Sequence, residues 1–346
     1  MNHRSYLGYT AKRVAVALVM ILAVSALVFF LFAVMPGDYF SSNRTLTPER
    51  IAELRSRYGL DKGVVERYWI WLGNAVRGDF GHSLQYNQPV TETIAPFLRN
   101  SFLVAAVSMV LTWTIAVVAG VLAATRQYSW FDKFVTAMLF ASLSIPAFFL
   151  GLVLIKVLSL DLGLLPTGGM YDTGSNATGL AAVIEVAHHM VLPVLILTFL
   201  SAGSLTRYFR TGMLEVLRAD YIRTARAKGL GEKAVVMRHG LRNALLPAIT
   251  LLAFELPGLF SGAIIIEQVM NWPGIGRMQL EAVQVRDYPV LMTVTVLLAA
   301  LTILANLVAD LLYTAADPRI RLVEQARRPA RRDARRAVRR GAVVTS

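Results

Sequence analysis

The polar residues that could do chemistry in this chain are few, and their spacing fits no catalytic or metal-binding motif. The five histidines lack an H-E-x-x-H pattern, and the adjacent His188 and His189 are expected at the interfacial end of a helix rather than on a metal. The absence of cysteine excludes a disulfide scaffold, a thiolate zinc site and cysteine catalysis. No G-x-x-x-x-G-K-[ST] phosphate loop occurs. The sequence therefore predicts no catalytic residue, no metal site and no bound cofactor on this chain.

The segment with the clearest signal for binding a membrane or a partner protein is basic. Residues 207–242 carry nine Lys or Arg, and an apolar stripe at helical spacing runs along their centre, made of Leu214, Leu217, Tyr221 and Ala225. Gly229 follows as a helix stop. Such a segment could lie on a membrane surface or insert into the groove of a partner protein. A solvated basic linker that only fixes the orientation of the chain explains these residues equally well.

The elements that must position this segment are long apolar runs. Of the 346 residues, 55% are hydrophobic and only 16% are charged, although the net charge is +13. A helix needs about 20 apolar residues to cross a bilayer. Six segments qualify as membrane-spanning helices: 14–35, 101–125, 134–157, 187–206, 244–267 and 288–310. The fold class is therefore an all-α membrane protein. Pro146 and Pro193 are expected to kink the third and fourth of these helices.

Lys and Arg in the short loops set the orientation. Arg4, Lys12 and Arg13 precede the first span, the 207–242 loop is basic, and ten Arg follow the last span, whereas residues 159–189 contain neither Lys nor Arg. The positive-inside rule then places both termini in the cytoplasm and the 36–98 loop outside. Within that loop, Thr47-Pro48-Glu49 predicts a helix over 48–58. The predicted organisation is a cytoplasmic N-terminus (1–13), a first span (14–35), an extracytoplasmic loop (36–98), a membrane core (99–313) that includes a cytoplasmic loop (207–243), and an Arg-rich cytoplasmic tail (314–346).

One acidic residue interrupts the fifth apolar run. Glu255 lies before Pro257-Gly258, a helix break. Charge at bilayer depth is expensive and usually faces a cavity or a partner, and broken helices tend to line cavities. Glu255, Pro257 and Gly258 are therefore candidates for a translocation path. Placement near the interface, or a hydrogen bond across a protein dimer, is an equal alternative.

Two further features have competing interpretations. Trp272-Pro273-Gly274 follows the fifth run and could form an extracytoplasmic gate or receptor contact, although an ordinary interfacial turn explains it as well. The arginine pairs between Arg327 and Arg340 could bind nucleic acid. Because they follow a membrane span on the cytoplasmic side, attraction to anionic lipid is the simpler explanation, and no nucleic acid is expected.

The basic segment resembles the cytoplasmic loop signature of ABC importer permeases, in which an E-A-A triplet is followed by a glycine four residues later. Here the triplet positions are Arg223-Thr224-Ala225, then Gly229. The missing acid and a longer spacing to Pro247 both resemble the dipeptide/oligopeptide/nickel branch. Further segments look like that branch in the same order: Met35-Pro36-Gly37-Asp38, Tyr58-Gly59-Leu60-Asp61, Arg77-Gly78-Asp79-Phe80-Gly81, Trp272-Pro273-Gly274-Ile275-Gly276, Arg286-Asp287-Tyr288-Pro289 and Asp317-Pro318-Arg319.

The resemblance implies a type I (MetI-like) permease in the bacterial inner membrane, working by alternating access. It implies a coupling helix at roughly 213–228 that docks in a cytoplasmic ATPase. The implied contact residues are Leu214, Leu217, Asp220, Tyr221, Arg223, Thr224, Ala225, Ala227, Lys228 and Gly229. The implied partners are a second, homologous permease in a heterodimer, two ABC ATPase subunits that hold ATP and Mg²⁺, and an extracytoplasmic solute-binding protein.

Peptides are the expected substrate, and oligosaccharides, nickel chelates or other small solutes are the alternatives within this class. A membrane-embedded enzyme or receptor, whose basic loop only orients the chain, is the alternative from another class. An exporter is disfavoured by the resemblance.

Overall fold

The computed structural model describes residues 3–35, 37, 39–40, 47–57, 59, 61–245, 248, 251 and 263–316. These residues are helical with connecting loops. In chain order the elements are α1 (His3–Val34), α2 (Pro48–Arg57), α3 (Val64–Ala75), α4 (Val90–Thr125), α5 (Trp130–Ser144), α6 (Ala147–Leu154), the π-helical η1 (Ile155–Asp161), α7 (Leu180–Leu217), α8 (Asp220–Ala227), α9 (Glu232–Ala234), the π-helical η2 (Val235–Leu241), α11 (Ile275–Val285) and α12 (Tyr288–Ala316). A helical segment at 263–269 precedes α11.

Four helices are long and apolar enough to cross a membrane: α1, α4, α7 and α12. Together with a bent pair formed by α5 and the α6–η1 segment, the described residues supply up to five such spans. The predicted helix at 48–58 is confirmed as α2. Most of the predicted 244–267 span lies outside the described residues, as do Glu255, Pro257 and Gly258.

The predicted third span at 134–157 is not one helix. α5 ends at Ser144, and the chain resumes as α6 at an angle of 106°. Pro146 supplies no N–H to continue the ladder and forces Ile145 into an extended conformation, with φ −86° and ψ 122°. Pro146 therefore breaks the span rather than only kinking it. In contrast, α7 continues as a single helix through Pro193.

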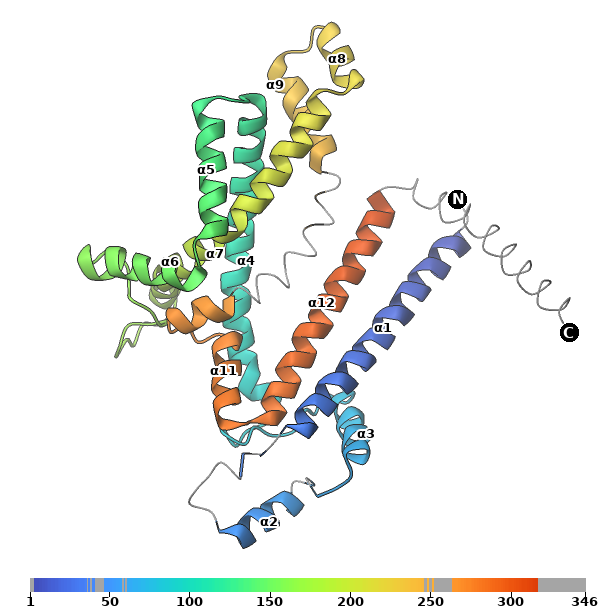
Figure 1. The fold of residues 1–346 in the computed structure, drawn as a ribbon, viewed down its shortest axis with the longest axis vertical. Coiled ribbons are helices and arrows are strands. Elements are labelled where there is room, and N and C mark those ends of the chain that lie inside the picture. Colours follow the sequence, from blue (N-terminus) through green and yellow to red (C-terminus); the bar gives the residue numbers. More distant parts are fainter. Residues whose placement is uncertain are drawn as a thin grey trace, which may run out of the picture.

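Two groups of helices make up the molecule (Figure 1). In one, α1 and α12 lie side by side and antiparallel, and the Arg13 guanidinium contacts the Asp310 carboxylate at 2.5 Å where α12 ends beside the start of α1. In the other, α4, α5 and α7 pack together, with α8 and α9 beyond the C-terminal end of α7. α11 contacts both α4 and α12 and so connects the two groups.

Among the described residues, the contact between α4 and α7 is the most extensive between any two helices. Within it Gly120 of α4 faces Phe209 of α7, where a Cβ built on Gly120 would lie 2.7 Å from the Phe209 Cβ and 3.0 Å from the Thr206 carbonyl oxygen. Real Cβ atoms do not approach so closely, so only glycine permits this crossing.

Substitution of Gly120 by alanine should separate α4 from α7. We expect Gly120→Ala to lower the stability of the purified chain by about 1–3 kcal/mol, since overpacking a well-packed contact forces the backbones apart. The matched control is Gly212→Ala on α7, where an added Cβ would meet nothing within 4 Å and should change stability favourably by about 0.5–1 kcal/mol. Thermal unfolding of both variants in detergent measures the difference. Equal behaviour of the two would contradict the close-contact interpretation.

Candidate functional site

The predicted coupling helix at 213–228 is two helices. α7 ends at Leu217, the Ala219 backbone is extended (φ −69°, ψ 149°), and α8 begins at Asp220. The last turn of α7 closes through short i to i−3 bonds, from Arg218 N to the Glu215 carbonyl and from Ala219 N to the Val216 carbonyl. The Ala219 carbonyl then accepts the first hydrogen bonds of α8. The segment therefore turns sharply at 218–219.

This turn divides the predicted apolar stripe. Leu214 and Leu217 are half-buried and pack around the fully buried Met213 of α7. On α8, Ile222 and Ala225 are buried against Val235. The fourth stripe residue, Tyr221, is 46% exposed, so its ring is not part of the buried face. Sequence periodicity missed Ile222 because it extended one helical phase across two helices.

The outer face of α8 gathers most of the predicted contact residues. Exposed residues there or just beyond it are Asp220, Tyr221, Arg223, Thr224, Ala227, Lys228 and Gly229. Gly229 has φ +79°, the left-handed conformation that ends a helix at little cost when the residue is glycine. The result is a short, basic helix that is held from one side and open on the other.

A bidentate ion pair fixes α8 relative to the following helix. Arg226 donates from Nε to Glu232 Oε2 at 3.0 Å and from its NH2 nitrogen to Oε1 at 2.6 Å. These hydrogen bonds from Arg226 lower the pKa of the Glu232 carboxyl. The pair is solvent-exposed, so its main effect is on geometry rather than stability.

A second bidentate pair anchors the helix that carries α8. Arg210, two turns before the end of α7, donates from Nε to Asp132 Oδ1 at 2.6 Å and from its NH2 nitrogen to Oδ2 at 2.8 Å. Asp132 is 4% exposed and also accepts from the Tyr128 backbone N–H at 2.9 Å. Asp132 was not predicted from the sequence; the Ser129 N-cap, whose hydroxyl accepts from the Asp132 N–H, marks the start of α5 but does not indicate Arg210 as its partner.

The Trp272-Pro273-Gly274 turn is a core element. Trp272 is fully buried, and its indole N–H donates to the Asn100 carbonyl at 3.3 Å while the Asn100 amide donates to the Pro273 carbonyl at 2.9 Å. The Trp272 side chain therefore packs inside the protein. An extracytoplasmic gate or receptor contact at Trp272-Pro273-Gly274 stays a prediction.

Glu267, an acidic residue that the sequence did not single out, lies in the helical segment before this turn and directs its carboxylate toward Gly274. Its Oε2 accepts from the backbone N–H groups of Gly276 (2.8 Å) and Arg277 (3.3 Å), and its Oε1 accepts from the Ser101 hydroxyl. Ser101 Oγ in turn accepts from the Ile275 N–H at 2.7 Å. The carboxylate thus caps the first turn of α11 and joins it to α4, as the helix dipole favours.

Loss of this cap should destabilise the protein. Glu267→Ala leaves buried backbone donors of α11 unpaired at a cost of about 1–3 kcal/mol each, whereas Glu267→Gln keeps an acceptor oxygen and should cost less. The control Glu281→Ala removes a part-exposed i,i+4 partner of Arg277 and should cost at most about 1 kcal/mol. Differential scanning fluorimetry of the purified full chain ranks the three. A Glu267→Ala variant no less stable than Glu281→Ala would contradict this role.

Comparison with known proteins places the chain in a family. Residues 116–322 match the model described as "Binding-protein-dependent transport system inner membrane component", and residues 6–110 match the model of the N-terminal region of such membrane components. The oligopeptide transport system permease protein AppB of Bacillus subtilis (strain 168) is 40% identical over 316 residues, covering 90% of this chain and 99% of that protein. The glutathione transport system permease protein GsiC of Escherichia coli (strain K12) is 37% identical over 319 residues, covering 91% and 99%.

A solved structure supports the fold. A chain of the inward-facing MetNI methionine ABC transporter aligns with a TM-score of 0.52 and 20% identity, covering 65% of this chain and 96% of that one. At this identity the likeness concerns the fold alone, which is all-helical and MetI-like. Together with the family matches along nearly the whole sequence, it shows that the chain belongs to the family of inner-membrane components of binding-protein-dependent transport systems.

Proposed function

We propose that this chain is the permease subunit of an ATP-driven ABC importer that carries peptides across the bacterial inner membrane by alternating access. The observation that carries the proposal is similarity over nine-tenths of the chain to relatives named for oligopeptide and glutathione transport. Glutathione is itself a small peptide, so both names point to the same substrate class. The members of this family are membrane components of transport systems, so the chain is a permease rather than an enzyme.

A permease of a binding-protein-dependent system works with a solute-binding protein and with an ATPase. We assign ATP and Mg²⁺ to two ABC ATPase chains, since this sequence has no phosphate loop. We further propose a second, homologous permease in a heterodimer, with the substrate path between the two. Residues such as Leu18, Leu27 and Val110 on α1 and α4 are more than half exposed, which leaves apolar faces that lipid or a second permease must cover.

The proposed topology has six spans and cytoplasmic termini. Its support is that the start of α1, the α4–α5 link, α8 and the end of α12 all lie toward one end of the molecule, while α2, α3 and α11 lie toward the other (Figure 1). The first group contains the segments that the positive-inside rule assigns to the cytoplasm. The Arg-rich tail, outside the described residues, is proposed to bind anionic lipid.

Within this function, α8 is proposed to be the element that docks on the ATPase. It is held to the permease through Ile222 and Ala225, which leaves Tyr221 and the neighbouring basic residues for a partner. An ATPase can drive transport only through contacts that differ between two states of the permease. A short helix with one anchored face and one open face can supply such contacts.

Uptake of a labelled tripeptide into proteoliposomes tests the function. With the binding protein and the ATPase present, we expect ATP-dependent uptake that unlabelled peptides of two to five residues inhibit. Uptake without ATP dependence would contradict the importer. ATP-dependent uptake of an oligosaccharide or a nickel chelate, with no inhibition by peptides, would contradict only the substrate class.

The docking role of α8 is tested by Tyr221→Ala. Because the ring is exposed, folding should be retained, while transport-coupled ATP hydrolysis should fall about 10-fold or more, the effect of losing an interface hot spot. Trp130→Ala is the matched control, since Trp130 is an exposed aromatic residue at the same end of the molecule but on α5. If both variants hydrolyse ATP like the original protein, Tyr221 does not contact the ATPase.

A further inference from the structure

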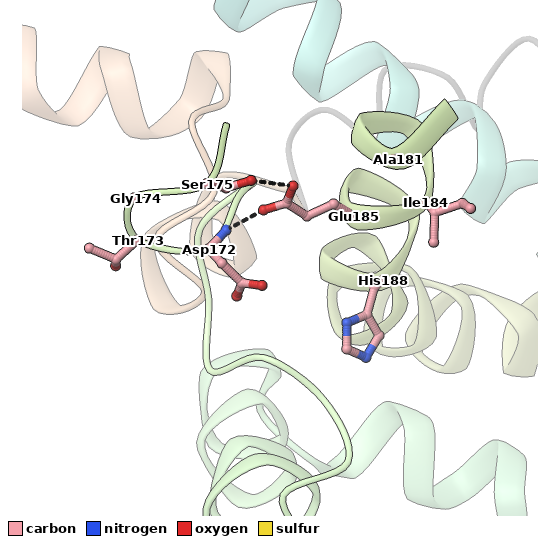
Figure 2. Close-up of a pocket in the computed structure, with 8 residues that line it drawn as sticks. All are labelled: Asp172, Thr173, Gly174, Ser175, Ala181, Ile184, Glu185 and His188. Atoms are coloured by element: carbon pink, nitrogen blue, oxygen red, sulfur yellow. Dashed lines mark hydrogen bonds between the residues drawn. The ribbon is translucent and has the colours of Figure 1, made fainter. Parts of the chain in front are cut away.

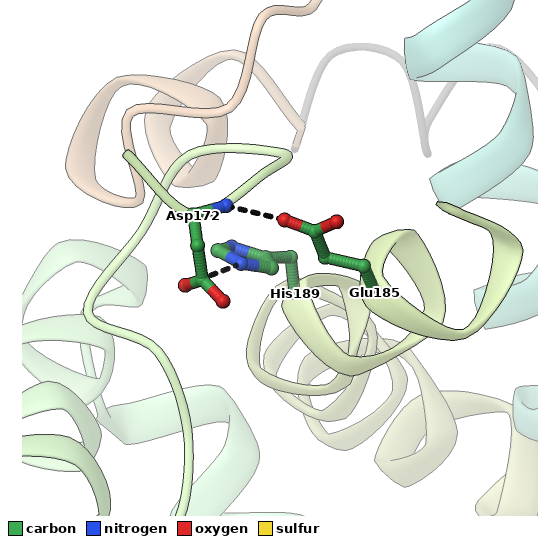
Figure 3. Close-up of side chains that lie close together, drawn as sticks. All are labelled: Asp172, Glu185 and His189. Atoms are coloured by element: carbon green, nitrogen blue, oxygen red, sulfur yellow. Dashed lines mark hydrogen bonds and ion pairs between the residues drawn. The ribbon is translucent and has the colours of Figure 1, made fainter. Parts of the chain in front are cut away.

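A group of three metal-ligand side chains lies at the other end of α7, where sequence analysis predicted no metal site. Glu185 and His189 are one helical turn apart on α7, and Asp172 comes from the loop that precedes the helix (Figure 3). One ligand atom from each lies within 4.8 Å of the other two. The sequence pattern missed the group because Asp172 is 17 positions from His189 and no motif relates them.

His189 is oriented as a metal ligand. Its side chain is 2% exposed, and Nδ1 lies 3.2 Å from the Gly168 carbonyl oxygen. A carbonyl oxygen only accepts, so Nδ1 carries the proton and donates it, which leaves a lone pair on Nε2 in the neutral ring. Histidines that bind metals almost always donate their second ring N–H to a backbone carbonyl or a carboxylate in this way.

The lone-pair nitrogen has no hydrogen bond. Nε2 is buried without a hydrogen-bond partner among the described residues, although Asp172 Oδ1 lies only 3.3 Å away. An unprotonated imidazole nitrogen and a carboxylate oxygen this close repel each other unless a positive charge lies between them. Two ligands of a tetrahedral ion, each about 2.0–2.1 Å from it, lie about 3.3 Å apart, so the observed separation fits one edge of such a site.

The Glu185 carboxylate is held in place by hydrogen bonds, whereas the Asp172 carboxylate is exposed. Glu185 is held in place, because its oxygens accept from the Asp172 backbone N–H and from the Ser175 hydroxyl, both at 2.7 Å (Figure 2). Asp172 is 76% exposed at its side chain, so its carboxylate can reorient toward a bound ion. The adjoining surface pocket of about 620 Å³, which Asp172, Ser175 and Glu185 help to line, gives an ion a path from solvent.

We infer that Asp172, Glu185 and His189 form a site for a divalent transition-metal ion of the Zn²⁺ class, with solvent in the fourth position. One imidazole and two carboxylates suit Zn²⁺, whereas Mg²⁺ and Ca²⁺ prefer oxygen ligands alone. The bound ion fastens the 162–179 loop to α7. That loop also contacts the turn at 270–274, since Gly169 N donates to the Met270 carbonyl at 2.8 Å. The inference stands whatever the transported substrate is.

Zinc binding to the purified full-length chain in its complex tests the inference. The complex is isolated with a histidine-free tag, stripped with a chelator, and titrated with Zn²⁺ against a chromogenic indicator. We expect one equivalent per copy of this chain that disappears in His189→Ala, counted as the difference between the two proteins, and no displacement by excess Mg²⁺. Tetrahedral ligation should also give Co²⁺ a strong visible absorption band in the original protein only.

Three variants keep the test sharp. Ser175→Ala removes the hydrogen bond to Glu185, together with a longer one from the Ala177 N–H at 3.3 Å, and should weaken binding about 10- to 100-fold, the cost of an outer-shell partner. We expect Zn²⁺ to raise the melting temperature of the original protein. Asp172→Asn changes an exposed side chain, so this variant should fold normally but show no such rise. The control His188→Ala should bind Zn²⁺ unchanged, because the His188 ring is directed to the Leu164 carbonyl instead.

Two outcomes would overturn the inference. One is Zn²⁺ binding by the original protein that is no tighter than binding by folded His189→Ala or Asp172→Asn, in which case a protonated His189 supplies the positive charge between the two groups. The other is an equal loss of binding in His188→Ala, which would mean that the ion sits elsewhere.

Discussion

The close crossing of α4 and α7 is the contact on which the rest of the molecule depends. α7 is a single helix of 38 residues, about 57 Å long at 1.5 Å per residue, and it carries α8 at one end and the Glu185–His189 turn at the other. A helix of this length acts as one body only where it is packed along its length. Gly120 allows the two backbones to approach, and the buried Phe209 fills the space beside it.

The polar contacts near the C-terminal end of α7 extend this rigidity to α8. Asp132 joins the start of α5 to Arg210 of α7, so a force on the end of α7 is shared by α5. Beyond Leu217 the chain turns, and α8 is held by the small cluster of Ile222, Ala225 and Val235. A cluster of this size anchors α8 but buries little of it. In the proposed function the ATPase therefore meets a helix that is anchored on one face and accessible on the other.

The features of the fold and the site that could be predicted from the sequence are those whose signal lies in neighbouring residues. Apolar runs predicted the four long apolar helices α1, α4, α7 and α12, and the motif around Tyr221 predicted the family, because both are read from neighbouring residues. The break at Ile145 and Pro146 was local too, but its size depends on where α6 finds packing partners. The two buried networks could not be predicted, since Asp132 and Arg210 are 78 positions apart and Ser101 and Glu267 are 166 apart. In both cases the sequence around one partner gives no indication of the other, because only the fold brings the two side chains together.

The buried carboxylate of Glu267 shows why such networks are specific. A buried charge that lacks partners costs several kcal/mol, so Glu267 is tolerated only while Ser101 of α4 and the N–H groups that open α11 stay in place. If α4 moved relative to α11, both partners would be lost together. The Trp272 indole and the Asn100 amide add two hydrogen bonds across the same junction. In the proposed function, alternating access therefore has to move α4 and α11 as one unit, and the change of shape must occur at the less polar contacts on either side of them.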